Sequence, residues 1–161
     1  MKISTNLFVL FVSISFWLLP SQALAGNKED IKGNNKEDIK DIAVVVNIEN
    51  KNVEHLTSKQ ISEIFLSRRR TFPSGDPVVV LEQEWNGAIR EAFFRLLNGM
   101  TLKRLNAYWG RLQFCGEVQP PAIMPNDMAM LDAIRNNSQA IGYISTVYLD
   151  ESVRAILILK E

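Results

Sequence analysis

Short apolar runs alternate with amphipathic stretches along most of the chain, and this pattern predicts a layered α/β domain. The run at 42–46, IAVVV, is continuous and β-branched, which favours a strand covered on both faces. Apolar runs at 77–81, 140–144 and 155–159 predict three further strands. The stretches between them have helical periodicity, so the predicted element order is β-α-β-α-α-α-β-β.

The first amphipathic stretch begins with a capping box and ends in three arginines. Thr57 is a good N-cap, and Gln60 has the spacing that reaches back to the Thr57 amide. Pro and Gly residues from position 73 onward stop the helix. Arg68, Arg69 and Arg70 therefore lie where a helix ends. There they either complement the helix dipole or form an anion site from guanidinium groups.

The second amphipathic stretch, 87–98, follows a predicted strand and ends at Gly99, which suits the C′ position. The amides at the start of a helix attract anions, and open α/β sheets bind ligands where such loops leave a strand. We therefore take four residues of this turn as candidate anion contacts, the last of which would add charge: Asn86, Gly87, Ala88 and Arg90. The alternative is an ordinary loop in which Asn86 only caps the helix.

Two further helices are predicted, one from Thr101 and one from Asn126 or Asp127. The segment 116–125 contains three prolines and is predicted to be a loop. Cys115 is the only cysteine, so no intramolecular disulfide can form. We expect a buried, inert thiol there, with a reactive or intermolecular thiol as the alternative.

The N-terminal residues predict export. Residues 1–25 combine a positive start, an apolar core at 7–19 and a small-residue cleavage signal, the pattern of a secretory signal peptide. Residues 26–41 contain the hexapeptide NKEDIK twice, and their high charge predicts a polar, disordered spacer. The folded domain is then expected at 42–161, with a periplasmic location.

Charge and motifs exclude several classes of function. Without Lys2, 17 basic residues stand against 18 acidic ones, a balance that argues against nucleic-acid binding. His55 is the only histidine, which excludes a His-rich metal site, and we expect it on the surface. No nucleotide-binding loop or nucleophile elbow is present, and Glu82 and Glu84 are expected to be solvated loop acids. We therefore predict no enzymatic activity, no catalytic residues and no cofactor.

A series of short motifs resembles the phosphate-binding proteins of ABC importers, which are type 2 periplasmic binding proteins. The motifs occur in the same order as in that family: VVVN at 44–47, LT at 56–57, IFL at 64–66, FPSG at 72–75, YW at 108–109, FCG at 114–116, PP at 120–121 and AIGY at 140–143. The resemblance implies a single α/β lobe with a mixed sheet flanked by helices. It also implies a non-enzymatic, periplasmic solute-binding module, with phosphate or another small anion as ligand and a membrane transporter or other periplasmic protein as partner.

The chain departs from that family in two ways. Family members have two lobes and chains roughly twice as long. The family also has a Ser-Gly-Thr phosphate loop, and the matching positions here hold Gly87, Ala88 and Ile89. At about 1.5–3 kcal/mol for each hydrogen bond to a charged group, losing both hydroxyl donors would turn a micromolar site into a millimolar one. The alternative function is therefore a protein-interaction or scaffold module, in which the former cleft surface binds another protein or a second copy.

Overall fold

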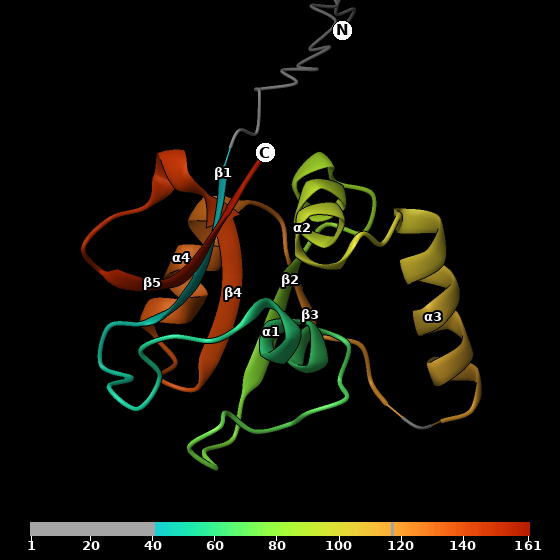
Figure 1. The fold of residues 1–161 in the computed structure, drawn as a ribbon, viewed down its shortest axis with the longest axis horizontal. Helices are drawn as coiled ribbons and strands as arrows, with labels where there is room; N and C mark the ends of the chain where they lie inside the picture. Colours follow the sequence, from blue (N-terminus) through green and yellow to red (C-terminus); the bar gives the residue numbers. More distant parts are fainter. Residues whose placement is uncertain (1–40, 117) are drawn as a thin grey trace, which may run out of the picture. The chain divides into compact units, whose positions relative to one another are not determined.

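The computed structural model describes residues 41–116 and 118–161 (Figure 1). The predicted signal peptide and the spacer up to residue 40 lie outside the described residues. Asp41, which we assigned to the spacer, is instead the first residue of strand β1. No helix within the described residues is long and apolar enough to cross a membrane.

The five strands of the described part of the chain form one mixed sheet in the order β3-β2-β4-β1-β5 (Figure 1). Strand β2 pairs in parallel with β3 and β4, while β1 runs antiparallel to both β4 and β5. The strands are β1 (Asp41–Asn47), β2 (Val79–Gln83), β3 (Ala122–Met124), β4 (Ala140–Ser145) and β5 (Val153–Lys160). This arrangement confirms the predicted mixed α/β class.

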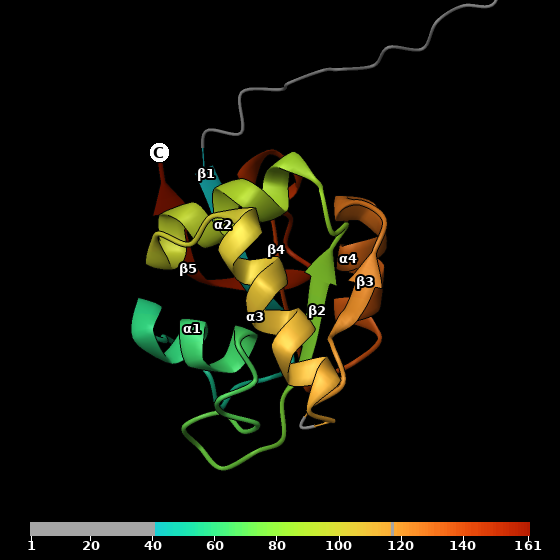
Figure 2. The same ribbon diagram turned by 90° about the vertical axis from the view of Figure 1, so that its right-hand side faces the viewer.

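Within residues 41–116 and 118–161, four α-helices and one 3-10 helix accompany the sheet. Their bounds are α1 (Ser58–Phe65), α2 (Ala88–Asn98), α3 (Leu102–Phe114), α4 (Asp127–Arg135) and η1 (Thr146–Tyr148). The capping box of Thr57 and Gln60 is present in α1, and Gly99 ends α2 with φ 70°, so both predicted helix signals are confirmed. Figures 1 and 2 show α3 outermost, at one end of the domain.

The β1 strand is buried on both faces, as its apolar run predicts. Ile42, Val44 and Val46 contribute to a core with residues of α1, α2 and α3, whereas Ala43 and Val45 contribute to a second core with residues of α4. All five side chains are fully buried. The helices therefore cover the two faces of the sheet, and the sheet lies between two apolar layers.

One side of the sheet carries a cluster of aromatic rings. Phe93 stacks on Tyr143 with ring centroids 3.9 Å apart, and Phe65 packs edge-on against Phe93 at 4.9 Å. Offset and edge-to-face pairs of this kind stabilise a core beyond their buried area. The cluster joins α1 and α2 to the middle of β4 and holds the middle of α2 against the sheet.

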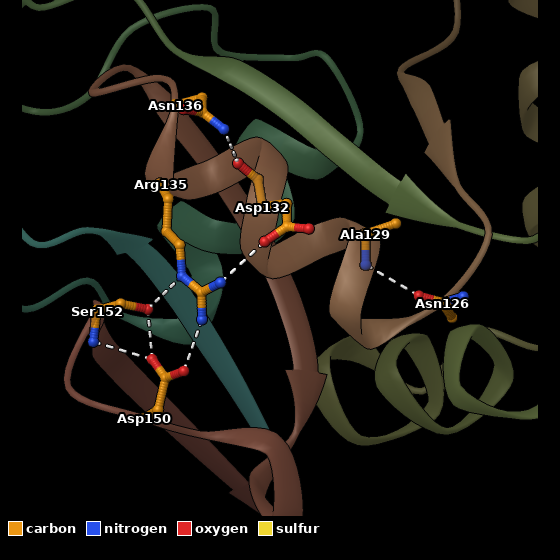
Figure 3. Close-up of polar contacts among 7 residues, drawn as sticks. All are labelled: Asn126, Ala129, Asp132, Arg135, Asn136, Asp150 and Ser152. Carbon is orange, nitrogen blue, oxygen red and sulfur yellow. Dashed lines mark hydrogen bonds and ion pairs between the residues drawn. The ribbon is translucent and has the colours of Figure 1, made fainter.

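The start and end of α4 are held by polar contacts, which Figure 3 shows. Asn126 accepts a hydrogen bond from the Ala129 amide at 2.9 Å and so caps the helix. At the other end the Arg135 guanidinium donates to Ser152 and Asp150, both at 2.6 Å. The two Arg135 contacts connect the end of α4 to the turn that precedes β5.

Several predictions about single segments are wrong. The second strand begins two residues later than expected and includes Gln83. The predicted loop 116–125 contains β3, whose three residues are too short to give a periodic signal but pair with β2. Cys115 is exposed, because it follows the last turn of α3 and lies off the face that buries Leu105 and Trp109.

Candidate functional site

The predicted anion contacts fall into two groups at opposite ends of β2 (Figure 2). Arg68, Arg69 and Arg70 precede the strand, and the residues 86–90 follow it. Arg70 lies beside the start of β2 because its carbonyl accepts a hydrogen bond from the Val78 amide at 3.1 Å, and the five residues of the strand span roughly 16 Å. The structure therefore does not bring the two groups together into one site.

The turn before α2 leaves the helix start without a side-chain cap. Gly87 occupies the N-cap position with φ −70° and ψ 144°, and no described side chain caps the helix. Asn86 is exposed and does not bond to the helix amides, so its predicted capping role is wrong. Gly87 instead donates its amide to the Glu84 carbonyl at 2.9 Å, which closes a tight turn. A Cβ at Gly87 would lie only 3.1 Å from that carbonyl oxygen.

Arg90 does not add free charge to this turn. Its side chain is 0% exposed and forms a buried ion pair with Glu82, which is 1% exposed. The guanidinium also donates to the Trp85 carbonyl and to Asn106, both at 3.1 Å, and lies 4.5 Å from the Trp85 ring centre. The expectation that Glu82 is a solvated loop acid is wrong, because β2 extends through it and points its carboxylate inward.

The electrostatics of this pair follow from its burial. Burial raises the pKa of Glu82, and the charge and hydrogen bond of Arg90 oppose that rise. Nearby, burial and then the Glu82 charge raise the pKa of the Tyr143 hydroxyl well above its ordinary value. Arg90 and Glu82 thus form a structural junction between β2 and α2, with no side chain directed at solvent.

The carboxyl ends of β2 and β4 are tied together by a carboxylate that the sequence alone did not point to. Asp127, in the first turn of α4, accepts hydrogen bonds from the Gln83 side chain at 2.9 Å and the Ser145 amide at 3.0 Å. Gln83 also donates to the Tyr143 carbonyl at 3.1 Å. Ligands of α/β sheets usually bind at this edge. Here the protein's own Asp127 carboxylate lies at the edge, in the first turn of α4, where the helix dipole favours an anion. The only sign of this carboxylate in the sequence was an acidic residue, Asp127, at the predicted start of a helix.

The same edge exposes apolar side chains. Met128 is 54% exposed at the start of α4, and Val147 is 82% exposed in η1. Glu84 is also exposed there, at the end of β2. Apart from the helix amides, the described residues at this edge therefore offer little that attracts an anion.

A groove of about 760 Å³ lies at the other end of β2. Arg69 and Arg70 line it together with Ser67, and its apolar wall includes Ile64, Val78 and Val80. Further lining residues come from the last turn of α3 and the segment after it: Gln113, Gly116, Val118, Gln119, Pro120 and Pro121. The groove thus combines two cations with apolar walls and side-chain amides.

The three arginines have different surroundings. Arg69 is 3.7 Å from the Glu63 carboxylate, and both side chains are about one-third exposed. Arg68 lies over the Tyr108 ring, 5.6 Å from its centre, and does not line the groove. Ser67 adopts φ 54°, which turns the chain sharply out of α1 so that consecutive arginines reach different surfaces.

No side-chain group in the described residues has the composition of a metal site, and His55 is exposed as expected. No protein-family model and no curated protein sequence matches the chain.

Comparison with solved structures finds phosphate-transport receptors. A phosphate ABC transporter substrate-binding protein with bound phosphate from Clostridium perfringens is 24% identical with a TM-score of 0.56; the match covers 73% of this chain and 45% of that one. An ABC-type phosphate transport receptor from Vibrio cholerae is 22% identical with a TM-score of 0.56, over 73% and 46%. PstS from Borrelia burgdorferi is 13% identical with a TM-score of 0.55, over 75% and 47%.

These matches confirm the family resemblance at the level of the fold. The chain spans less than half the length of the solved structures it matches. What it shares with phosphate ABC transporter substrate-binding proteins is the α/β architecture of one part of those molecules.

Proposed function

We propose that the protein is a non-enzymatic, solute-binding-type module that binds a small oxyanion, with inorganic phosphate as the first candidate. The observation that carries this proposal is the groove in which Arg69 and Arg70 meet apolar walls. The choice of phosphate is supported by the fold shared with proteins described as phosphate receptors, one of them with phosphate bound.

The groove suits an oxyanion better than the α2 turn does. Guanidinium groups offer several donors in a planar fork that matches phosphate oxygens. The α2 turn offers backbone amides and the exposed Asn86 side chain but no cation, because Arg90 is already paired, and Glu84 nearby is exposed and acidic. We propose Asn86, Gly87 and Ala88 as a second, weaker contact region for the same class of ligand.

The expected affinity is modest. The groove is open, so water and salt screen its charges, and Arg69 already has a partner in Glu63. Two charge-assisted hydrogen bonds at roughly 1.5–3 kcal/mol each correspond to a dissociation constant around the millimolar level. Such binding is far weaker than a dedicated transport receptor needs, unless a partner completes the site.

Calorimetric titration at low salt tests the proposal, using the protein purified from cells that express the full sequence. We expect saturable phosphate binding that is tighter than sulfate binding, because a protonated phosphate oxygen can donate to an acceptor such as Gln113 while sulfate cannot. The double variant Arg69→Gln/Arg70→Gln should weaken binding about tenfold or more. The matched control is Arg95→Gln, which removes an exposed arginine paired with Glu161 on another surface.

A second variant separates the groove from the α2 turn. Ala88→Pro removes one amide at the first position of α2, where proline is tolerated, and Gly87 already has the extended backbone that precedes proline. Unchanged affinity in this variant, with loss in the arginine variant, would assign phosphate to the groove. Equal phosphate affinity in the wild type and the arginine variant would refute the groove as the site.

We also propose that the protein is exported and acts in the periplasm, in proximity to a membrane transporter or another periplasmic protein. The support is the sequence pattern of residues 1–25 and the class of the structural neighbours. A second candidate function, a protein-interaction module, is favoured by a different surface. Phe114 is 95% exposed at the end of α3, which is unusual for a large apolar side chain.

A further inference from the structure

The exposed face of α3 carries only basic charge. The helix contains Lys103, Arg104 and Arg111 and no acidic residue. Lys103 and Arg104 lie eight and seven residues before Arg111, about two turns, so at 100° per residue all three project within one broad stripe. The opposite face buries Leu105, Trp109 and Leu112, and the basic stripe therefore points away from the core. The chain as a whole has no net charge, so this concentration is local.

Arg68 extends the basic stripe beyond α3. It leaves α1, lies over the Tyr108 ring, and lines a depression of about 410 Å³ with residues of α3. The Tyr108 hydroxyl donates to the Leu66 carbonyl at 2.7 Å, which fixes the ring as part of the floor. The depression has an apolar floor and a basic rim, and its lining residues are Arg68, Met100, Arg104, Ala107, Tyr108 and Arg111.

An apolar side chain stands at the end of the same stripe. Phe114 follows Arg111 by three residues, which places both on one side of the helix. It is 95% exposed, while Ala107 between the charged positions is small and also exposed. The surface thus combines a shallow apolar floor, three arginines and a protruding aromatic ring.

We propose that this surface of α3 and Arg68 is a docking site for an acidic, amphipathic segment of a partner protein. Carboxylates of the partner pair with the guanidinium groups, and an apolar side chain of the partner fills the depression over Tyr108 and Ala107. Arginine is among the side chains most enriched at the energetic centres of protein interfaces, and phenylalanine is enriched at interfaces in general. The inference is independent of the proposed small-anion site, which uses Arg69 and Arg70 in the other groove.

The shape of the surface favours a protein segment over a lipid membrane. A membrane surface attracts basic residues through a diffuse field and needs a flat or convex face with inserted apolar groups. Here the apolar floor lies in a depression lined by Arg68, Arg104 and Arg111, which suits a projecting apolar side chain flanked by carboxylates. An acidic amphipathic helix provides about three to four such side chains per two turns on one face.

Three labelled synthetic peptides of equal length test the proposal by fluorescence anisotropy. One has glutamates and leucines in a helical amphipathic pattern, the second has lysines in place of the glutamates, and the third has glutamines in place of the leucines. We expect saturable binding of the first peptide, no binding of the second, and binding of the third that is about tenfold weaker or more. A bimane label on the single exposed cysteine, Cys115, should change its emission only when a peptide occupies the α3 surface.

The protein variants locate the interaction. Arg104→Glu/Arg111→Glu should weaken binding of the acidic peptide at least about tenfold. Arg95→Glu/Lys160→Glu makes the same change in net charge on other exposed positions and should leave the affinity unchanged. Phe114→Ser should weaken binding without altering its salt dependence, and circular dichroism should show that each variant stays folded.

Three outcomes would overturn the inference. The first is absence of saturable binding of the acidic peptide up to about 1 mM. The second is equal weakening by the two charge-reversed pairs, which would indicate a general field effect. The third is binding to phosphatidylcholine–phosphatidylglycerol vesicles that depends on Arg104 and Arg111 while the acidic peptide does not bind, which would identify a membrane surface. Loss of phosphate binding in Arg69→Gln/Arg70→Gln bears on the groove alone.

Discussion

Removing one partner of the buried Glu82–Arg90 pair tests how strongly the β2–α2 junction depends on charge. Both side chains are essentially inaccessible to water. In Glu82→Gln the guanidinium keeps its hydrogen bonds to the Trp85 carbonyl and to Asn106, but it loses its counter-charge. A buried cation without a counter-charge is costly because the desolvation penalty is no longer offset.

The expected magnitude is large for a domain of this size. Breaking a buried ion pair by removing one partner costs about 3–5 kcal/mol. The free energy of unfolding of a small domain is about 5–15 kcal/mol, so Glu82→Gln should lose a large part of the total stability. Arg90→Met should cost a similar amount near neutral pH, since it leaves the carboxylate buried and unpaired.

The two single variants should differ in their pH dependence. In Arg90→Met nothing opposes the effect of burial, so the pKa of Glu82 rises further above its unfolded value of about 4.3. An acid with a raised pKa binds more protons in the folded state than in the unfolded state. Its contribution to the free energy of unfolding is therefore fully present below the unfolded pKa and is lost as pH rises through the folded pKa. Glu82→Gln has no titrating group at this position and should lack this slope.

The double variant Glu82→Leu/Arg90→Met separates charge pairing from packing. In the pair itself, Oε1 of Glu82 and Nη2 of Arg90 have no hydrogen-bond partner among the described residues. Replacing an incompletely satisfied buried pair by apolar side chains of similar volume is often neutral or stabilising by about 1–4 kcal/mol. We expect the double variant to be at least as stable as the wild type, which requires a coupling energy of several kcal/mol.

Urea denaturation followed by tryptophan fluorescence and circular dichroism measures these free energies. The fluorescence is informative because Trp85 lies against the Arg90 guanidinium and should report the junction. Losses below about 1 kcal/mol in both single variants would refute the reasoning, because they would place the pair in a hydrated environment. Independent, additive losses in the double variant would refute it equally, since they would mean that the charges do not interact.

Two further predictions test local contacts. Asn126→Ala should cost about 0.5–2 kcal/mol of unfolding free energy, because Asn126 caps α4, while Asn86→Ala should change stability by less than about 0.5 kcal/mol; urea denaturation compares the two, and equal losses would contradict the assignment of the caps. Hydrogen bonds from Ser152, and then the charge of Arg135, lower the pKa of Asp150, so its contribution to stability is present above its unfolded pKa and is lost as pH falls through the folded value (Figure 3). Ser152→Ala should raise the Asp150 pKa in a carboxyl NMR titration, and an unchanged value would remove Ser152 as the cause.

The helices were largely predictable because their signals are local. The α1 capping box needs only Thr57 and Gln60 at the right spacing, and Gly99 ends α2 because its backbone has a positive φ. The fully buried strand β1 was predictable for the same reason, since five consecutive apolar residues need cover on both faces. Each of these features depends only on residues within one helix or one strand and its immediate ends.

The misassigned residues depend on contacts between elements. Glu82 and Arg90 are eight residues apart in sequence, and only the tight turn at Gly87 brings them together. Asn86 has the right residue type for a cap, yet the turn places Gly87 at the N-cap position. The strand β3 exists because β2 offers it a parallel partner, and nothing in its own three residues indicates a strand.

The direction of β2 explains why a single anion site at this strand does not form. The sequence places arginines before the strand and a helix start after it, and both features attract anions when considered alone. An extended strand keeps its two ends apart, and at the carboxyl end the fold uses its own charges internally. Arg90 neutralises Glu82, and Asp127 accepts the donors of Gln83 and Ser145. Other basic side chains lie at the other end of β2, where Arg69 and Arg70 line the groove, and along α3, so binding experiments should look for ligands on those surfaces first.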